Sequence, residues 1–395
     1  MKSLTERMRN IKRHIDDNNI TIMILGLGSV GNYLLDYLAS TEDESFNLVV
    51  VGRNYEKMVS DVNIVKISSL IRKKCKSNFT IEAGIDFNNI VSLENCIRKY
   101  NPDFIVNTSR VYSGLKYGSI SWNKLRAYGI WAPLAIKYIK NIMEAHDRSN
   151  SDSIVINTSY SDAVIPWLKT SGHNYPDFGS GNINHLIPRI KYAVADELGV
   201  KDFWNVKVML ATSHFHDVVI SKEGQTEGMT QLIKIFYNGE EIKLDQNEIF
   251  EHCKILMPTD AKRNMMNASS NYDIIISIIK ALREGITTSF YSPGALGEIG
   301  GYPVYVNGED FSAGIDDSVF DIAEMRKANR ASIALDGIEN VENGILTYTD
   351  CLLEKVKRVF NVELPKTVPY EKIDETANFI IQNIIDPEMK IRMGK

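Results

Sequence analysis

The sequence has few of the residues that build disulfide scaffolds, and it has no run long enough to cross a membrane. Its 395 residues include four cysteines, Cys75, Cys96, Cys253 and Cys351, whose spacing fits neither a disulfide framework nor a metal site. No apolar stretch approaches the length of a membrane span, and the first residues lack the apolar core of a signal peptide. We therefore expect a cytoplasmic protein with reduced thiols, no bound metal and no membrane partner.

An excess of charge of one sign is also lacking. The chain carries 45 Lys and Arg against 50 Asp and Glu, so its net charge is -5, and the charges are interspersed. Such a pattern gives no reason to expect a nucleic-acid partner. Repeats and low-complexity linkers are absent as well. The length suits one large or two medium domains with a sizeable core.

The first strong pattern is a glycine-rich turn between an apolar run and a helical segment. Residues 20–25 are apolar and mostly β-branched, Gly26, Gly28 and Gly31 follow, and residues 32–38 continue at helical spacing. In a dinucleotide-binding unit the first glycine permits the turn, the second lets a pyrophosphate approach, and the third lets helix and strand pack closely. The N–H groups at the helix N-terminus would bind the phosphates. The alternative is a turn whose glycines serve packing alone.

The end of the next predicted strand bears on the choice of cofactor. Residues 48–52 form this strand, and Arg53 and Asn54 follow it. An acidic residue here binds the ribose hydroxyls of NAD, whereas a basic residue suits the 2′-phosphate of NADP. We therefore expect NADP, with NAD as the alternative in which Arg53 is solvated and stacks on the adenine.

Two further apolar strands end in small polar residues. Residues 104–106 lead into Asn107, Thr108 and Ser109, and residues 154–156 lead into an asparagine. In a doubly wound sheet such strand ends face the cofactor. The candidate cofactor-binding residues are Gly26, Gly28, Ser29, Val30, Gly31, Arg53, Asn54, Asn107, Thr108 and Ser109.

The two halves of the chain differ in pattern. Residues 1–157 alternate strand and helix, which predicts an α/β fold with a doubly wound parallel Rossmann sheet. Residues 158–395 contain a strand at 206–211, a hairpin that turns on Asn238-Gly239 and an apolar helix at 273–282. We expect this half to be an α+β catalytic domain.

The order of these motifs resembles the lactate/malate dehydrogenase superfamily. Asn157 at a strand end precedes a Gly-Ser-Gly turn at 179–181, an arginine-bearing segment at 188–200 that ends in Leu-Gly-Val, and a strand that leads to His214. The resemblance implies a second domain of lactate/malate dehydrogenase type.

The resemblance also implies roles for four residues. Asn157 would hold the substrate oxygen or the nicotinamide ribose, and Arg189 would pair with a substrate carboxylate. His214 would exchange a proton with the substrate while a hydride moves to or from the nicotinamide. The mobile loop of the family carries an arginine that polarises the carbonyl. In the corresponding loop of this chain, 111–122, Lys116 is the candidate cation, and Arg110 at the start of the loop is a substitute only if the loop folds differently.

One feature near His214 and Arg189 departs from the family pattern. The acidic partner of the histidine should lie three residues before the substrate arginine, where this chain has Leu186. Without a carboxylate, the pKa of His214 should be lower. His216 competes for the proton-transfer role. A metal site of His214, His216 and Asp217 is a further alternative, although no additional ligand lies at a familiar spacing.

Arg189 directly follows Pro188, a residue that favours the first position of a helix. We therefore expect a helix that ends at Leu198 and holds Arg189 in its first turn. The helix dipole disfavours a cation there, and a ligand role would explain its presence.

The leading hypothesis is an NAD(P)-dependent oxidoreductase. It would act on a carbonyl/alcohol or imine/amine pair of a carboxylate-bearing small molecule other than lactate or malate, because the loop arginine and the acidic partner are missing. One alternative is a dinucleotide-binding sensor or partner subunit without turnover. Another is a lyase, isomerase or hydrolase that uses hydride transfer transiently. By the same resemblance we expect a homodimer or a dimer of dimers.

Overall fold

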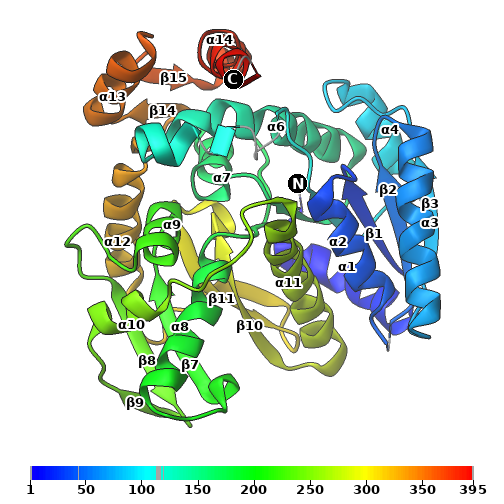
Figure 1. Cartoon of the computed structure of the whole chain (residues 1–395). Helices are drawn as coiled ribbons and strands as arrows, with labels where there is room; N and C mark the ends of the chain where they lie inside the picture. Colours follow the sequence, from blue (N-terminus) through cyan, green and yellow to red (C-terminus); the bar gives the residue numbers. More distant parts are fainter. Residues whose placement is uncertain (1, 43, 113–116, 119, 394–395) are drawn as a thin grey trace.

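The computed structural model describes residues 2–42, 44–112, 117, 118 and 120–393. Its largest sheet has six parallel strands in the order β3-β2-β1-β4-β5-β6; Figure 1 labels β1, β2 and β3 of this sheet. These strands are β1 (Ile20–Leu25), β2 (Phe46–Val51), β3 (Asn78–Glu82), β4 (Phe104–Asn107), β5 (Ile154–Asn157) and β6 (Phe178–Gly179). The strand order reverses between β1 and β4, which is where open α/β sheets bind ligands. The predicted doubly wound sheet is confirmed.

Helices cover both faces of this sheet. They are α2 (Ser29–Ala39), α3 (Tyr55–Ile71), α4 (Ile90–Tyr100), α6 (Ala132–Ser149) and α7 (Ser161–Thr170). Because side chains alternate along a strand, Ile22 and Ile24 of β1 pack in the apolar layer that contains α2 and α3, whereas Met23 and Leu25 pack in the layer that contains α4, α6 and α7. The sheet is therefore buried on both sides, as expected for parallel strands.

The second half of the chain forms three small sheets. Their strands are β7 (Val206–Ala211), β8 (Leu232–Tyr237) and β9 (Glu240–Ile242); β10 (Thr287–Pro293), β11 (Gly301–Asn307) and β12 (Ser312–Ile315); and β13 (Ile338–Glu342), β14 (Ile345–Tyr348) and β15 (Thr367–Pro369). The hairpin predicted at Asn238-Gly239 joins β8 to β9, and both turn residues have the positive φ that such a turn requires.

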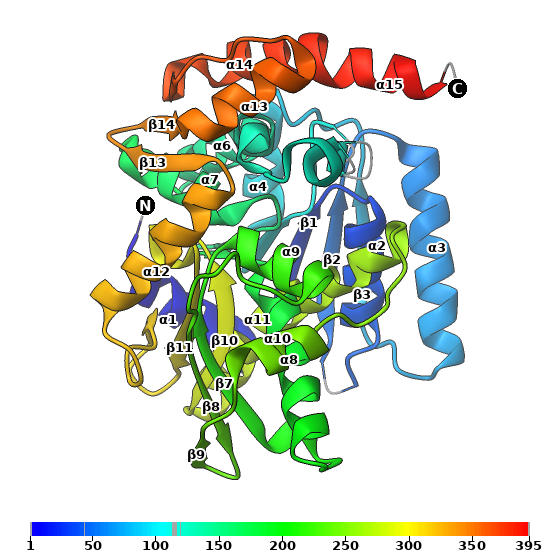
Figure 2. The ribbon, with the colours of Figure 1, turned by 60° about the vertical axis from the view of Figure 1, so that its left-hand side comes forward.

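The helices of the second half surround these sheets and meet the parallel sheet. They are α8 (Ile183–Glu197), α9 (His214–Glu223), α10 (Gln246–His252), α11 (Asn264–Glu284), α12 (Ile322–Leu335), α13 (Asp350–Phe360), α14 (Ile373–Ile380) and α15 (Asp386–Met393). Helix α11 packs along α2 and so joins the two halves, and α14 lies on α6 (Figures 1 and 2). Strand β6 comes from beyond residue 157, and the division of the chain into domains there stays a prediction.

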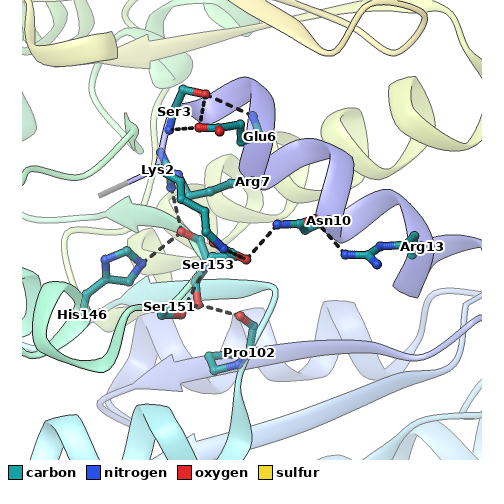
Figure 3. Close-up of polar contacts among 11 residues, drawn as sticks. Lys2, Ser3, Glu6, Arg7, Asn10, Arg13, Pro102, His146, Ser151 and Ser153 are labelled. Carbon is teal, nitrogen blue, oxygen red and sulfur yellow. Dashed lines mark hydrogen bonds and ion pairs between the residues drawn. The ribbon is translucent and has the colours of Figure 1, made fainter.

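The N-terminal helix α1 (Leu4–Asp16) is held against the sheet by a buried arginine. Arg7 donates hydrogen bonds to both carboxylate oxygens of Asp177 and, at 2.8 Å, to the Ser153 carbonyl. The His146 Nε2 lies 3.2 Å from the same carbonyl, and Figure 3 shows Arg7, His146 and Ser153 meeting beneath α1. We call Arg7, His146, Ser153 and Asp177 the α1 cluster.

Over the residues described, none of the helices combines the length and the apolar character that a membrane crossing requires.

Candidate active site

The glycine turn has the predicted conformation. Gly26 has a φ of +93°, and a Cβ on Gly31 would lie 2.3 Å from the Gly26 carbonyl oxygen, so only glycine fits where helix and turn meet. A Cβ on Gly28 would meet no atom within 4 Å, which leaves the backbone open to a ligand. Helix α2 begins at Ser29 without a side-chain cap, so the N–H groups of its first turn can bind phosphate. The turn therefore fits a pyrophosphate, and the contact itself stays a prediction.

A cleft of about 770 Å³ begins at this turn and crosses the carboxyl ends of the parallel strands. Eight of the ten predicted cofactor-binding residues line it: Gly26, Gly28, Ser29, Val30, Arg53, Asn54, Thr108 and Ser109. Gly31 and Asn107 lie behind it, and Asn107 donates a hydrogen bond of 2.9 Å to the Asn157 side chain.

The lining of the cleft is cationic. Arg53, Lys57, Arg110 and Arg263 contribute to it, and no Asp or Glu does among the residues that the structure describes. Asn54, beside Arg53, caps α3 by accepting a hydrogen bond of 3.0 Å from the Lys57 N–H. A cleft with several cations and no carboxylate fits a ligand with several negative charges, which is the chemistry of a dinucleotide.

His214 lies at the predicted place, in the first turn of α9 directly after β7. Its Nδ1 donates a hydrogen bond of 2.9 Å to the carboxylate of Asp336. The same carboxylate accepts a hydrogen bond of 2.7 Å from the Tyr160 hydroxyl and another of 2.7 Å from the Tyr128 N–H. The ring of Tyr128, which lines the cleft, meets the His214 ring edge-on with centroids 4.6 Å apart. His214 thus has a fixed orientation next to a residue of the cleft wall, and no described residue makes a hydrogen bond with its Nε2.

The expectation of a lowered pKa for His214 is wrong. Burial alone would lower the pKa of this imidazole, but the hydrogen-bonded Asp336 carboxylate, together with Asp162 and Asp217, outweighs burial and raises it. Burial raises the pKa of Asp162 to about 6 and that of Asp217 to about 7. We call Tyr160, Asp162, His214, Asp217 and Asp336 the cleft cluster.

His216, the alternative proton-transfer residue, is enclosed by the protein. Its Nδ1 lies 2.6 Å from the Ser332 hydroxyl and its Nε2 lies 3.2 Å from the Thr226 carbonyl, so both ring nitrogens have partners. Within the described ranges, no three His, Cys, Asp or Glu side chains are arranged to hold a metal ion.

Asn157 is completely buried and does not line the cleft. Its amide donates hydrogen bonds to the Ser159 carbonyl and the Ser161 hydroxyl and accepts one from Asn107. Direct contact with a substrate would require these bonds to open, and the role of Asn157 stays a prediction. Lys116, the candidate loop cation, lies outside the described residues.

Arg189 is not in the first turn of its helix, contrary to the expectation from Pro188. Helix α8 begins at Ile183, because buried residues recur at helical spacing from that residue onward. The Arg189 guanidinium donates hydrogen bonds to the carbonyls of Cys253 (2.9 Å) and Ile255 (3.4 Å), and the residue does not line the cleft. Its predicted contact with a substrate stays a prediction: the protein occupies the two terminal nitrogens of the guanidinium, and the buried Nε makes no hydrogen bond with a described residue.

Comparison with known proteins gives a structural match without a sequence match. No protein-family model matches the chain, and no curated protein matches it significantly. The lactate dehydrogenase of Cryptosporidium parvum, solved with lactic acid and nicotinamide adenine dinucleotide, superposes with a TM-score of 0.53 at 13% identity, over 80% of this chain and 96% of that chain. The malate dehydrogenases of Cryptosporidium parvum (TM-score 0.51, 15% identity, 80% and 98%) and Aeropyrum pernix (0.50, 18%, 80% and 96%) are similar in the same way. The chain has the lactate/malate dehydrogenase fold.

Within this dehydrogenase fold, two residues of the site were not found from the sequence. Asp336, the partner of His214, follows α12 and is 122 positions away in the chain. Arg263 ends a short 3-10 turn, η4 (Ala261–Arg263), before α11. Neither belongs to a local motif, so no sequence signal marks them.

Proposed function

We propose that this protein is a nicotinamide-dinucleotide-dependent dehydrogenase or reductase that acts on a carbonyl/alcohol or imine/amine group of a carboxylate-bearing metabolite. The observation that carries the proposal is the His214–Asp336 pair beside a cation-lined cleft that starts at the glycine turn. The dehydrogenase fold is consistent with this chemistry and does not identify the substrate.

His214 would transfer the proton. The Asp336 carboxylate favours the imidazolium, which can donate a proton from Nε2 to a carbonyl oxygen during reduction; the neutral ring can accept one during oxidation. Tyr160 and Tyr128 hold Asp336 and so fix the orientation of the ring. A nicotinamide bound in the cleft would accept or supply the hydride.

We propose NADP as the cofactor, with NAD as the alternative. Arg53 follows β2 and lines the cleft, so a cation lies where a 2′-phosphate would bind, beside Lys57, which pairs with Asp61. Arg53→Asp should then weaken NADPH binding by roughly 1.5–3 kcal/mol, the scale of hydrogen bonds to a charged group, and spare NADH. Fluorescence titration of both cofactors measures this difference. Equal affinities of the unmodified protein for NADPH and NADH would contradict the preference.

The function is tested by mixing the protein with NADPH and a panel of 2-oxo acids, with and without ammonium. Consumption of the reduced cofactor by one of them, dependent on His214, is the expected outcome. Cofactor binding without any turnover would favour the sensor hypothesis. Failure to bind either cofactor would refute the proposal.

We also propose a homodimer or a dimer of dimers. The outer face of α3 exposes Ile64, Ile67, Leu70 and Ile71, and an apolar patch of this kind on a single chain usually marks an interface. Light scattering at micromolar concentration should give at least twice the mass of the chain, and Ile67→Glu should shift it toward the monomer. A monomeric mass for the unmodified protein would exclude this proposal.

A further inference from the structure

Arg263 is a cation on the cleft wall without a partner. It lines the cleft, and no residue in the described part of the chain makes a hydrogen bond or ion pair with its guanidinium. By contrast, Arg126 pairs with Glu223 and Arg283 pairs with Glu44. The planar guanidinium offers five N–H donors in a geometry that matches a carboxylate, so an unpaired arginine on a cleft is suited to bind an anion.

This cation lies at the catalytic end of the cleft. Burial lowers the pKa of His185 to about 3, and the positive charges of Arg263 and Arg189 act in the same direction. Arg263 also acts electrostatically on Tyr128, whose ring contacts His214, and on Asp217 of the cleft cluster. Arg263 lines the cleft together with Tyr128, whose ring contacts His214, whereas Arg53 and Lys57 follow β2.

A second polar group on the wall also lacks a partner. His185 lines the cleft, and its buried Nε2 makes no hydrogen bond with any described residue. The Asp217 carboxylate lies 4.0 Å from Nδ1, and this negative charge favours a proton on Nδ1. Nε2 is then an acceptor on a neutral ring. A buried polar atom without a partner is unfavourable in a protein, which is a reason to look for a ligand there.

We propose that Arg263, rather than Arg189, binds the carboxylate of the substrate, and that His185 accepts a hydrogen bond from a hydroxyl or amino group of the same molecule. The substrate class is thus a small carboxylate that carries a hydrogen-bond donor besides its reacting group. Arg189 holds the segment after α10 through the carbonyls of Cys253 and Ile255. This inference rests on the proposed function, because it takes the ligand to be the molecule that reacts at His214.

The test measures anion binding by calorimetry, with the full-length protein alone and with saturating NADPH. The probes are oxalate, malate, tartrate and citrate, of which the last three carry hydroxyls. Arg263→Gln should weaken the tightest probe by about 10- to 100-fold, the effect of losing charge-assisted hydrogen bonds, and change the NADPH affinity less than about twofold. Lys262→Gln, which removes an exposed cation from the same turn, is the matched control and should change neither affinity.

His185→Phe separates the two contacts. It should weaken the hydroxylated probes by about 5- to 10-fold, the effect of one neutral hydrogen bond, and leave oxalate unchanged. The proposal is overturned if no probe binds, if Arg263→Gln binds the probes normally, or if that variant loses NADPH affinity instead. If the protein binds neither NADH nor NADPH but loses anion binding through Arg263→Gln, the proposed function fails while the Arg263 site stands.

Discussion

The α1 cluster and the cleft cluster both bury charge, but they balance it differently. In the α1 cluster, the Arg7 guanidinium meets the Asp177 carboxylate in two hydrogen bonds, and burial keeps His146 neutral by lowering its pKa to about 4. In the cleft cluster, three carboxylates surround one imidazole, and the pKa values of His214, Asp162 and Asp217 are all raised.

On the proposed function, the difference separates a structural cluster from a reactive one. Matched charges hold α1 on the sheet, and none of the four residues lines the cleft, whereas His214 of the cleft cluster meets the ring of Tyr128 on the cleft wall. Unmatched carboxylates with raised pKa values exchange protons near neutral pH, which is the usual condition of an acid–base site. Substitutions in the first cluster should therefore change stability, and those in the second should change turnover.

The largest expected effect is on turnover. His214→Asn should slow the reaction by roughly 10²–10⁴-fold, the usual contribution of a general acid–base group, with nearly unchanged cofactor affinity. The rate with saturating cofactor and the calorimetric affinity measure the two quantities.

His216→Asn is the internal control, because His216 is bonded to Ser332 and Thr226 within the protein. This substitution should slow the reaction far less than His214→Asn does. An exchange of the two outcomes would move the assignment to His216. If neither variant slows the reaction by even about tenfold, histidine acid–base chemistry is wrong here.

The next largest effect is on stability. Arg7→Met leaves Asp177 buried without its counter-charge, which should cost about 3–5 kcal/mol in the free energy of unfolding. Adding Asp177→Asn should recover part of that loss, because the uncompensated charge is then gone. Urea denaturation checks both, and calorimetry should show unchanged NADPH affinity. A loss below about 1 kcal/mol would show that the pair does not hold the fold.

The sequence predicted the features that depend on residues close together in the chain. The glycine turn, the hairpin at Asn238-Gly239 and the position of His214 after β7 each depend on a few neighbouring residues, and all three are where they were expected. The start of α8 was misplaced because apolar spacing from Ile183 outweighs the preference of Pro188 for a first turn.

The charge environment of the site could not be predicted in this way. Asp336 reaches His214 through the packing of α12 beside α9, and Arg263 reaches the cleft through the turn before α11. Both depend on long-range packing that leaves no pattern in the neighbouring residues. The absent acidic residue before Arg189 was noticed correctly, but the fold supplies a carboxylate from another segment, and the inferred pKa direction was therefore reversed.

The smallest expected effect concerns pH: the two clusters should change the free energy of unfolding in opposite directions as the pH changes. His146 has a pKa of about 4 in the folded protein, below its ordinary value, so its contribution to stability is present above about pH 6.5 and is lost as the pH falls through 4. Asp217 has a pKa of about 7, above its ordinary value, so its contribution is present below about pH 3.8 and is lost as the pH rises through 7.

Urea denaturation of three proteins at about pH 4.5 and pH 7 resolves the two contributions. On acidification, His146→Gln should lose about 2 kcal/mol less free energy of unfolding than the unmodified protein does, because glutamine takes up no proton. Asp217→Asn should lose about 2 kcal/mol more free energy of unfolding on acidification than the unmodified protein does. In the unmodified protein the buried carboxyl becomes ionised as the pH rises, which destabilises the fold, whereas the amide stays neutral. The test depends on the directions of the two changes and not on their exact sizes. If both variants changed the pH dependence in the same direction, the buried charges of the two clusters would not differ in kind. The division into a structural and a reactive cluster would then fail.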